Sequence, residues 1–294
     1  MELRDIEIFL TLAEELHFGR TAERLNVTPA RITQAIKKQE RQIGALLFER
    51  TNRSVRLTSV GEQLRRDLQP VYAEIADSVE RAKRAARGKS ALLRLGLMPF
   101  NTTEQRRYWD EFRTRHPECE LRIRRCPYVD PFEMLRGGDF DALVIWLPVH
   151  EPDLTAGPVL FTDNRILAVS EDHELAGLDS VSIETLADFQ HVTSPRMPDY
   201  WEDAYLPFHS PAGRPILREQ VATTSDELIE MIATGEYVHV FPAHVTRYWA
   251  VPHIRWVPVP DLPPLDYALV WKTAAETESI RQLAAVIREL RSDS

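Results

Sequence analysis

The sequence has almost no cysteine and no long apolar run. No stretch of about 18 consecutive apolar residues occurs, so the chain is not expected to span a membrane. The opening stretch, MELRDIEIFL, carries acidic residues where a secretory signal would have a basic segment and an apolar block. The only two cysteines, Cys119 and Cys126, lack CxxC spacing and a neighbouring histidine cluster, which argues against a zinc site and a disulfide framework. We therefore expect a cytoplasmic protein that binds no metal.

The common catalytic signatures are absent as well. GxSxG, GxxxxGKS, HExxH and GxGxxG do not occur, and these mark many hydrolases, phosphate loops, zinc proteases and dinucleotide sites. The nine histidines are scattered. His239 and His244 flank VFPA, but a strand residue and a following loop residue rarely form a catalytic pair. We expect that the protein is not an enzyme and needs no cofactor.

Positive charge is scarce overall and unevenly distributed. The 294 residues have a net charge of −9. Residues 1–66 hold 12 Lys and Arg against 9 Asp and Glu, whereas the rest of the chain holds 24 against 36. Between residues 28 and 58 seven basic residues face only two acidic ones. A basic patch on an acidic body is the pattern expected where one end of a protein meets phosphate.

Three helices are predicted at the N-terminus. Apolar residues at three- and four-residue steps between Leu3 and Leu16 indicate a helix with one buried face. A second helix is expected from about residue 19 to 25, followed by a corner at RLNV, because Asn26 suits the left-handed conformation that ends a helix. Thr28 and Pro29 suit the N-cap and the first position of a third helix.

The third helix is expected to have a polar outer face. Ile32, Ala35 and Ile36 form its inward stripe. The residues left facing outward are Arg31, Thr33, Gln34, Lys37 and Lys38. Two short helices joined by a tight corner, with such side chains on the second, are what a helix-turn-helix reader of the major groove requires. A polar surface helix without a nucleic-acid role is the alternative for this pair taken alone.

The stretch LLFERTNRSVRLT, after the third helix, favours a β-hairpin wing. A buried LLF precedes a basic turn with Arg50, Asn52 and Arg53, and SVRLT forms the returning strand. A narrow minor groove attracts an inserted arginine because its potential is more negative. On such a wing, Arg53 is therefore expected to enter the minor groove.

These residues carry a family resemblance. The segment from residue 2 to 64, with AERLNV, IKKQERQIGALLFER and RLTSVGE, resembles without a gap the N-terminal winged helix-turn-helix of LysR-type transcriptional regulators. The resemblance implies DNA contacts from the third helix and the wing. The positions that match are Thr28, Thr33, Gln34, Lys37, Arg50 and Arg53. The family usually has Ser-Gln-Pro-Ala or Ser-Gln-Pro-Ser where this chain has residues 28–31, TPAR, so the base preference beside the helix start is open.

A long helix is predicted over residues 59–87. Its apolar positions recur at three and four residues over several turns, which suits packing on a second copy of the chain or on its own domain. Pro70 is expected to kink it or to displace its N-terminal part, and Gly88 to end it. The resemblance implies a linker helix that pairs two subunits, and an assembly of two dimers.

The rest of the chain reads as an α/β body. Strand-like runs such as LLRLGLM and FDALVIWLP alternate with helical stretches, which predicts a mostly parallel sheet with helices on both faces. A second series of strands and helices begins at RILAVS. The last strand and helix of the chain are expected to pack with the first series. This pattern resembles the two-lobed effector domain of the same family, which is similar to periplasmic binding proteins. The expected boundaries are 1–58 for the winged helix-turn-helix, 59–87 for the linker, 88–161 with 266–294 for the first lobe, and 162–265 for the second.

Small ligands in such folds bind in the cleft at the carboxyl ends of strands, where helix N-termini favour an anion. The candidate residues are Thr102, Thr103, Trp146, Thr193 and Ser194. A cap or turn residue without a ligand is the alternative for each of them.

The sequence thus predicts a LysR-type regulator whose DNA binding changes when a small effector enters its cleft. Its expected partners are double-stranded promoter DNA with an interrupted palindrome, a small effector for which an anion is the favoured chemistry, and further copies of the chain. RNA polymerase is a candidate further partner, and no membrane is expected. A small-molecule receptor using only the second domain and an architectural DNA-binding protein that ignores ligands are the alternatives; the latter would show no effector-dependent change in DNA affinity.

Overall fold

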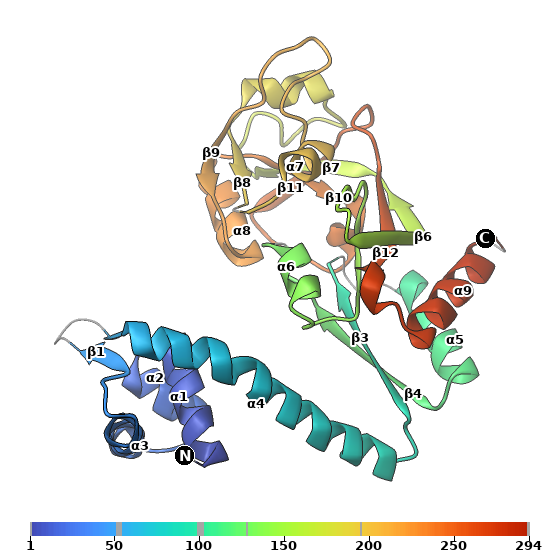
Figure 1. Cartoon of the computed structure of the whole chain (residues 1–294). Helices are drawn as coiled ribbons and strands as arrows, with labels where there is room; N and C mark the ends of the chain where they lie inside the picture. The colour runs from blue at the N-terminus through green and yellow to red at the C-terminus, as the bar shows by residue number, and fades with distance from the viewer. Residues whose placement is uncertain (1, 51–54, 99–102, 128, 195, 293–294) are drawn as a thin grey trace. The chain divides into compact units, whose positions relative to one another are not determined.

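The computed structural model describes residues 2–50, 55–98, 103–127, 129–194 and 196–292 (Figure 1). The chain divides into two compact units, residues 1–88 and 89–294. Each unit has its own buried apolar core, one in the first unit and three clusters in the second. The combination of an N-terminal helical unit with a hairpin and a larger α/β unit is the predicted fold class.

The first unit contains three short helices, a hairpin and one long helix. The elements are α1 (Leu3–Glu15), α2 (Phe18–Arg24), α3 (Pro29–Ile43), β1 (Phe48–Arg50), β2 (Val55–Leu57) and α4 (Ser59–Ala86). The corner between α2 and α3 forms as its residues predict. Asn26 adopts a left-handed φ of 51°, and the Thr28 side chain accepts a hydrogen bond from the backbone N–H of Arg31 at 3.3 Å.

Three polar side chains of α3 bind other segments of the first unit. Asp5 is buried, and its carboxylate lies 3.3 Å from the ammonium of Lys38. The side-chain amide of Gln39 donates to the backbone oxygen of Asp5 at 2.9 Å. Glu40 is also buried, and its Oε1 accepts from the backbone N–H groups of Leu47 at 3.1 Å and Phe48 at 3.4 Å. Glu40 therefore holds the start of β1 against α3.

Replacing Glu40 by alanine is expected to destabilise residues 1–88 by about 2 kcal/mol, because two buried N–H groups lose their acceptor. Thermal unfolding of the full-length chain, followed by circular dichroism, measures the change. Glu49→Ala is the matched control, since Glu49 is exposed on the same segment. Equal unfolding temperatures for Glu40→Ala and the unchanged chain would contradict the assignment.

The long helix α4 presents two different apolar sets. Leu64, Leu68 and Tyr72 pack against the core of the first unit. Val71, Ile75 and Val79 lie at four-residue steps and are exposed, so they form a separate stripe. Pro70 lies inside a continuous helix. The helix thus contacts its own unit along one side, and three of its described apolar side chains form an exposed stripe along another.

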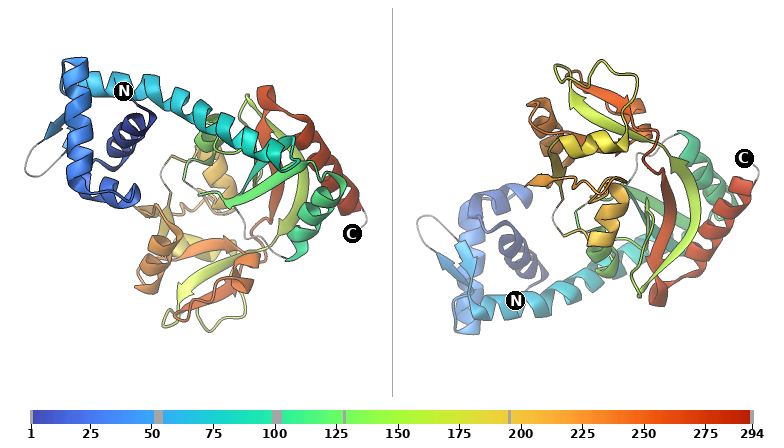
Figure 2. Two further views of the ribbon diagram at one scale, coloured as in Figure 1. Left: turned by 90° about the horizontal axis from the view of Figure 1, so that it is seen from below. Right: turned by 90° about the horizontal axis from the view of Figure 1, so that it is seen from above.

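A five-stranded sheet forms one half of the second unit. Its strands are β3 (Ala91–Leu97), β4 (Cys119–Arg125), β5 (Ala142–Trp146), β6 (Leu154–Asp163) and β12 (Leu265–Lys272), in the order β4-β3-β5-β12-β6. The helices α5 (Thr103–Arg115) and α9 (Glu278–Ser292) lie side by side against it (Figure 2). The short helix α6 (Pro131–Arg136) precedes β5. The last strand and helix of the chain therefore belong to this half.

The prediction of a mostly parallel sheet is confirmed for four of the five strands, since β4, β3, β5 and β6 run in one direction and β12 runs against them. β3 runs parallel to β4 and β5, but β12 pairs antiparallel with both β5 and β6. Because β12 returns from the far end of the chain instead of through a β-helix-β crossover, nothing constrains it to run parallel. The boundary expected between residues 161 and 162 falls inside β6, and the division into two lobes stays a prediction.

The other half of the second unit is built on a three-stranded antiparallel sheet. It contains β7 (Arg165–Ser170), β10 (His239–Pro242) and β11 (Ile254–Pro258), with β7 in the centre. A parallel pair, β8 (His191–Thr193) and β9 (Arg218–Val221), lies in the same stretch of chain. The helical segments here are η1 (Ile183–Asp188), α7 (Asp199–Tyr205), α8 (Ser225–Ala233) and η2 (Ala243–Arg247), and η3 (Thr273–Ala275) follows β12.

The helix α7 joins the two halves. It follows β8 in sequence, yet its Trp201 is fully buried in the core of the five-stranded sheet. The Trp201 ring stacks on Trp146 of β5 with centroids 3.9 Å apart. The two residues also exchange hydrogen bonds, from Trp201 Nε1 to the Trp146 oxygen at 3.0 Å and from Trp146 Nε1 to the Trp201 oxygen at 3.4 Å. The halves are thus connected through packed side chains as well as through the chain.

Both cysteines are buried and free. Burial raises the pKa of the Cys126 thiol to about 12 and also raises that of Cys119, so neither is a ready thiolate. In the described part of the chain, no group of three or more His, Cys, Asp and Glu could hold a metal ion. None of the described helices combines the length and the apolar character that crossing a membrane needs.

Candidate functional site

The outer face of α3 is the first candidate site. Arg31, Gln34 and Lys37 are exposed. The basic side chains of Arg31 and Lys37 make no ion pair within the described residues. Thr28 uses its hydroxyl oxygen to cap the helix, and the Thr33 hydroxyl donates to the Pro29 oxygen at 3.0 Å. Arg31, Gln34 and Lys37 therefore keep their donors for an external partner.

Lys38 differs from the other four residues predicted to face outward. Its side chain is about half exposed, and its ammonium pairs with the buried carboxylate of Asp5. Burial raises the pKa of Asp5, but a hydrogen bond from the backbone N–H of Glu2 and the Lys38 ammonium together outweigh it, so the pKa is lowered. Lys38 thus has a structural role within the first unit beside any external one.

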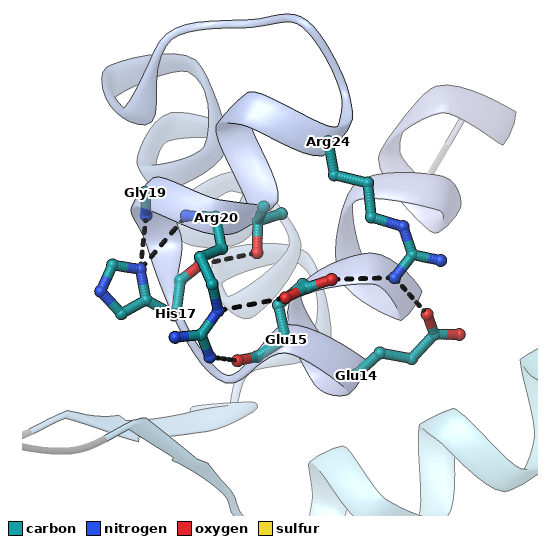
Figure 3. A network of polar contacts seen from close by, with 7 residues as sticks. Glu14, Glu15, His17, Gly19, Arg20 and Arg24 are labelled. Atoms are coloured by element: carbon teal, nitrogen blue, oxygen red, sulfur yellow. Dashed lines mark hydrogen bonds and ion pairs between the residues drawn. The ribbon is translucent and has the colours of Figure 1, made fainter. Parts of the chain in front are cut away.

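The basic residues of α2 are already neutralised (Figure 3). Arg24 Nη1 lies 2.8 Å from a Glu14 oxygen and 3.0 Å from a Glu15 oxygen. Arg20 donates to the same Glu15, through Nε to its carboxylate at 3.2 Å and through Nη2 to its backbone oxygen at 2.6 Å. The positive charge of the helix pair that remains unpaired is therefore on α3.

A histidine begins α2 in place of the usual capping residues. His17 Nδ1 accepts hydrogen bonds from the backbone N–H groups of Gly19 at 3.1 Å and Arg20 at 3.2 Å (Figure 3). Only an unprotonated Nδ1 can accept, so the proton of the neutral ring is assigned to Nε2. This cap satisfies two backbone N–H groups at the start of α2.

The hairpin β1–β2 forms where the sequence predicts a wing. Its strands pair antiparallel, with Phe48 opposite Leu57 and Arg50 opposite Val55. Of Arg50 only the backbone is described, and Arg53 lies outside the described residues. Their contacts with DNA stay a prediction.

The second candidate site is a cleft in the second unit with a volume of about 100 Å³. Trp146, Thr193 and Ser194 line it, so the structure brings three of the five candidate residues together. Thr102 lies outside the described residues, and of Thr103 only the backbone is described, at the start of α5. The cleft residues come from β4, β5, β8 and the segment after it, α7, α8, β10, η2 and β12, and from segments next to these elements. Both halves of the unit therefore contribute to it.

One carboxylate, that of Glu202, lines the cleft, and a second one, that of Asp163, contacts a residue that does. Glu202 of α7 lies 2.9 Å from Nε of Arg218 and accepts from the Thr193 hydroxyl at 2.5 Å. Asp163 Oδ2 lies 2.7 Å from Nδ1 of His244 and accepts from the backbone N–H of the same residue at 2.9 Å. The Glu202 carboxylate is therefore paired with a guanidinium, and the Asp163 carboxylate is bound by a histidine that lines the cleft.

Sequence reasoning missed most of the cleft wall. Tyr205, His239, His244 and Tyr267 line it, and Arg125 does so at the end of β4. The position of Arg125 at the carboxyl end of β4 could have been found from the expected strands. The contribution of α7 could not, because its Trp201 packs on a strand 55 residues earlier in the chain.

Comparisons with known proteins cover both units. The family model for "Bacterial regulatory helix-turn-helix protein, lysR family" matches residues 3–62, and that for "LysR substrate binding domain" matches residues 86–292. The chain is 32% identical over 209 residues to the HTH-type transcriptional regulator AlsR of Bacillus subtilis, which covers 71% of this chain and 68% of AlsR.

The fold is similar to solved structures over almost its whole length. The crystal structure of CbnR, a LysR family transcriptional regulator, matches with a TM-score of 0.70 at 18% identity and covers 98% of this chain and 99% of that one. Full-length CbnR complexed with its target DNA matches with a TM-score of 0.68, also at 18% identity and with the same coverage.

Proposed function

The chain belongs to the LysR family of transcriptional regulators, and we propose that α3 reads the major groove of promoter DNA while the β1–β2 wing meets the minor groove. The observation that carries this proposal is the pair of exposed cations on α3, Arg31 and Lys37, beside an α2 whose arginines are already paired. Unpaired cations next to polar side chains suit phosphate contact combined with base readout.

Within this interface the residues take different roles. Gln34 and Arg31 have the side chains for base edges, and Lys37 the one for phosphate. The hydroxyl groups of Thr28 and Thr33 already make hydrogen bonds to the backbone at the start of α3. These two residues can therefore contact DNA only close to that end of the helix. Arg50 and Arg53 complete the interface from the wing, and Lys38 supports it through Asp5.

Replacing Lys37 by alanine is expected to weaken binding to all duplexes alike, because a phosphate contact carries no sequence information. The slope of log affinity against log salt concentration should become shallower by about 0.9. Anisotropy titrations of the full-length chain at several salt concentrations, with DNA from its own upstream region and a scrambled duplex, measure both effects.

Arg24→Ala is the matched control for Lys37→Ala, because its guanidinium is bound to Glu14 and Glu15 and its loss should leave the slope nearly unchanged. A slope that Lys37→Ala leaves unchanged would remove Lys37 from the interface. Equal affinity of the unchanged chain for the two duplexes would count against sequence-specific reading of that DNA.

The exposed stripe of α4 supports a dimer. Val71, Ile75 and Val79 repeat at four-residue steps, which suits packing on the same helix of a second copy. A two-fold dimer presents two copies of α3, so its operator is an interrupted palindrome. We extend the proposal to an assembly of two dimers, with RNA polymerase as a further partner.

The cleft between the two halves is proposed as the effector site, with Trp146, Thr193 and Ser194 in its wall. Thr102 and Thr103 stay candidates at the segment that leads into α5. The effector must bind one arrangement of the halves or subunits more tightly than the other, since equal affinity shifts nothing. The function is regulation through ligand binding, without a chemical step in the cleft.

A further inference from the structure

Lys38 lies on the side of α3 that carries the proposed DNA contacts. Arg31, Gln34 and Lys38 are separated by three and four residues, so their side chains follow one another along a single stripe of the helix. All three are exposed, and so is Lys37, the residue before Lys38. The ammonium of Lys38 is therefore placed beside the side chains that are proposed to contact bases and phosphate.

The charge of Lys38 is bound within the first unit. Its Nζ lies 3.3 Å from Oδ2 of Asp5 on α1, an oxygen that also accepts from the backbone N–H of Glu2 at 3.3 Å. The side chain of Asp5 is 5% exposed, whereas that of Lys38 is 47% exposed. Separating the pair would leave a buried carboxylate without its cation, which costs more free energy than breaking an exposed ion pair.

The placement of α3 does not depend on the charge of Asp5. Gln39 is fully buried, and its side-chain amide donates to the backbone oxygen of Asp5 at 2.9 Å. Ile32, Ala35 and Ile36 of α3 also pack in the core of the first unit. A substitution that changes only the side chain of Asp5 keeps all of these contacts. The charge of Asp5 can therefore be tested without moving the helix.

The basic residues of α3 differ in whether their charge is already compensated. Arg31 and Lys37 make no ion pair among the residues that the structure describes. A lysine that meets phosphate strengthens DNA binding by releasing a counterion from the duplex. Lys38 would have to leave Asp5 to do so, or bring the negative charge of Asp5 towards the phosphate. In both cases the gain in binding free energy is reduced.

We propose that Asp5 keeps the charge of Lys38 from DNA and thereby limits the sequence-independent part of the affinity. This inference rests on the proposed function, since it takes α3 to be the DNA reader. Asp5 is buried and acts only through Lys38, so it is a positioning residue. Phosphate contacts carry no sequence information. One more of them would hold the protein more tightly on unrelated DNA without adding selectivity.

Asp5→Asn tests the proposal, because asparagine has the shape of aspartate, keeps an oxygen for the Glu2 N–H and carries no charge. Lys38 can then contact phosphate. The slope of log affinity against log salt concentration should become steeper by about 0.9. The affinities for the upstream and the scrambled duplex should rise by the same factor, about eightfold at 0.1 M salt. Anisotropy titrations of the full-length chain measure both effects.

The double variant Asp5→Asn/Lys38→Gln is the matched control. Both charges of the pair are removed together, so its slope should equal that of the unchanged chain. A slope that Asp5→Asn leaves unchanged would overturn the proposal. So would a double variant as steep as Asp5→Asn, because the added charge would then act without Lys38.

Lys38→Gln alone gives an answer even where Asp5→Asn does not fold. Glutamine still donates to the Asp5 carboxylate, and the variant should change the slope far less than Lys37→Ala does. A slope as shallow as that of Lys37→Ala would show that Lys38 already contacts phosphate in the unchanged chain, and this would overturn the proposal.

The unchanged chain separates this inference from the proposed function. Equal affinity of the unchanged chain for the upstream and scrambled duplexes would count against the proposed function. Selective binding with a slope that Asp5→Asn leaves unchanged would overturn the role of Asp5 and leave the proposed function intact.

Discussion

Replacing Trp201 by alanine is expected to lower the free energy of unfolding of the second unit by about 4 kcal/mol. The side chain is fully buried, it stacks on Trp146 at 3.9 Å, and it contacts Phe132 with ring centroids 4.9 Å apart. Alanine would leave a large cavity in the core of the five-stranded sheet. It would also leave the backbone oxygen of Trp146 without the indole N–H that it accepts.

Urea denaturation of the full-length chain, followed by circular dichroism, measures this loss. Trp201→Phe should lose less, because it keeps an aromatic ring and removes only the N–H. Trp256→Ala is the control at a half-buried tryptophan of β11, and a smaller loss is expected there. A Trp201→Ala variant as stable as Trp256→Ala would mean that α7 is not anchored by its tryptophan.

Acid is expected to destabilise the second unit through a buried histidine. His191 is fully buried, and burial lowers its pKa from 6.5 to about 4. In the unfolded chain the imidazole takes up a proton below about pH 6.5, whereas in the folded chain it stays neutral until about pH 4. Its contribution to stability is therefore complete above pH 6.5 and is lost as the pH falls to 4, by about 3 kcal/mol. The lowered pKa of His239 acts in the same direction.

The dependence is measured as the free energy of unfolding in urea between pH 7 and pH 4. His191→Gln should flatten the curve over this range, since glutamine does not titrate. His253→Gln is the control, because His253 is exposed beside Glu171. A curve that His191→Gln leaves as steep as before would show that other groups cause the acid sensitivity.

The first unit could be predicted closely because its signals are local. Asn26, Thr28 and Pro29 each favour one backbone conformation at the corner, and each adopts it. Neighbouring apolar positions give the buried faces of α1 and α3. Local sequence signals could not show which basic residues lack an acidic partner. Lys38, for example, pairs with Asp5, 33 residues away.

The second unit was predictable in its elements and less so in their pairing. The strands could be recognised as apolar runs, but the direction of β12 depends on a return from the far half of the chain. Arg165 opens a strand whose other five residues carry no charge, so the sequence alone gave no reason to expect its side chain to be buried. The role of the short helix α7 depends on a contact between Trp146 and Trp201, for which no periodic pattern exists.

The docking of α7 limits how this regulator can be re-engineered. One route to a different ligand specificity is to graft one half of the second unit from another member of the family. Here a graft of residues 162–265 would carry Trp201 into a foreign sheet, where no Trp146 need be present to stack on it and exchange hydrogen bonds. A working hybrid must therefore contain both tryptophans from the same protein. The alternative is to transfer all of residues 89–294, so that the recipient protein supplies only the DNA-binding domain.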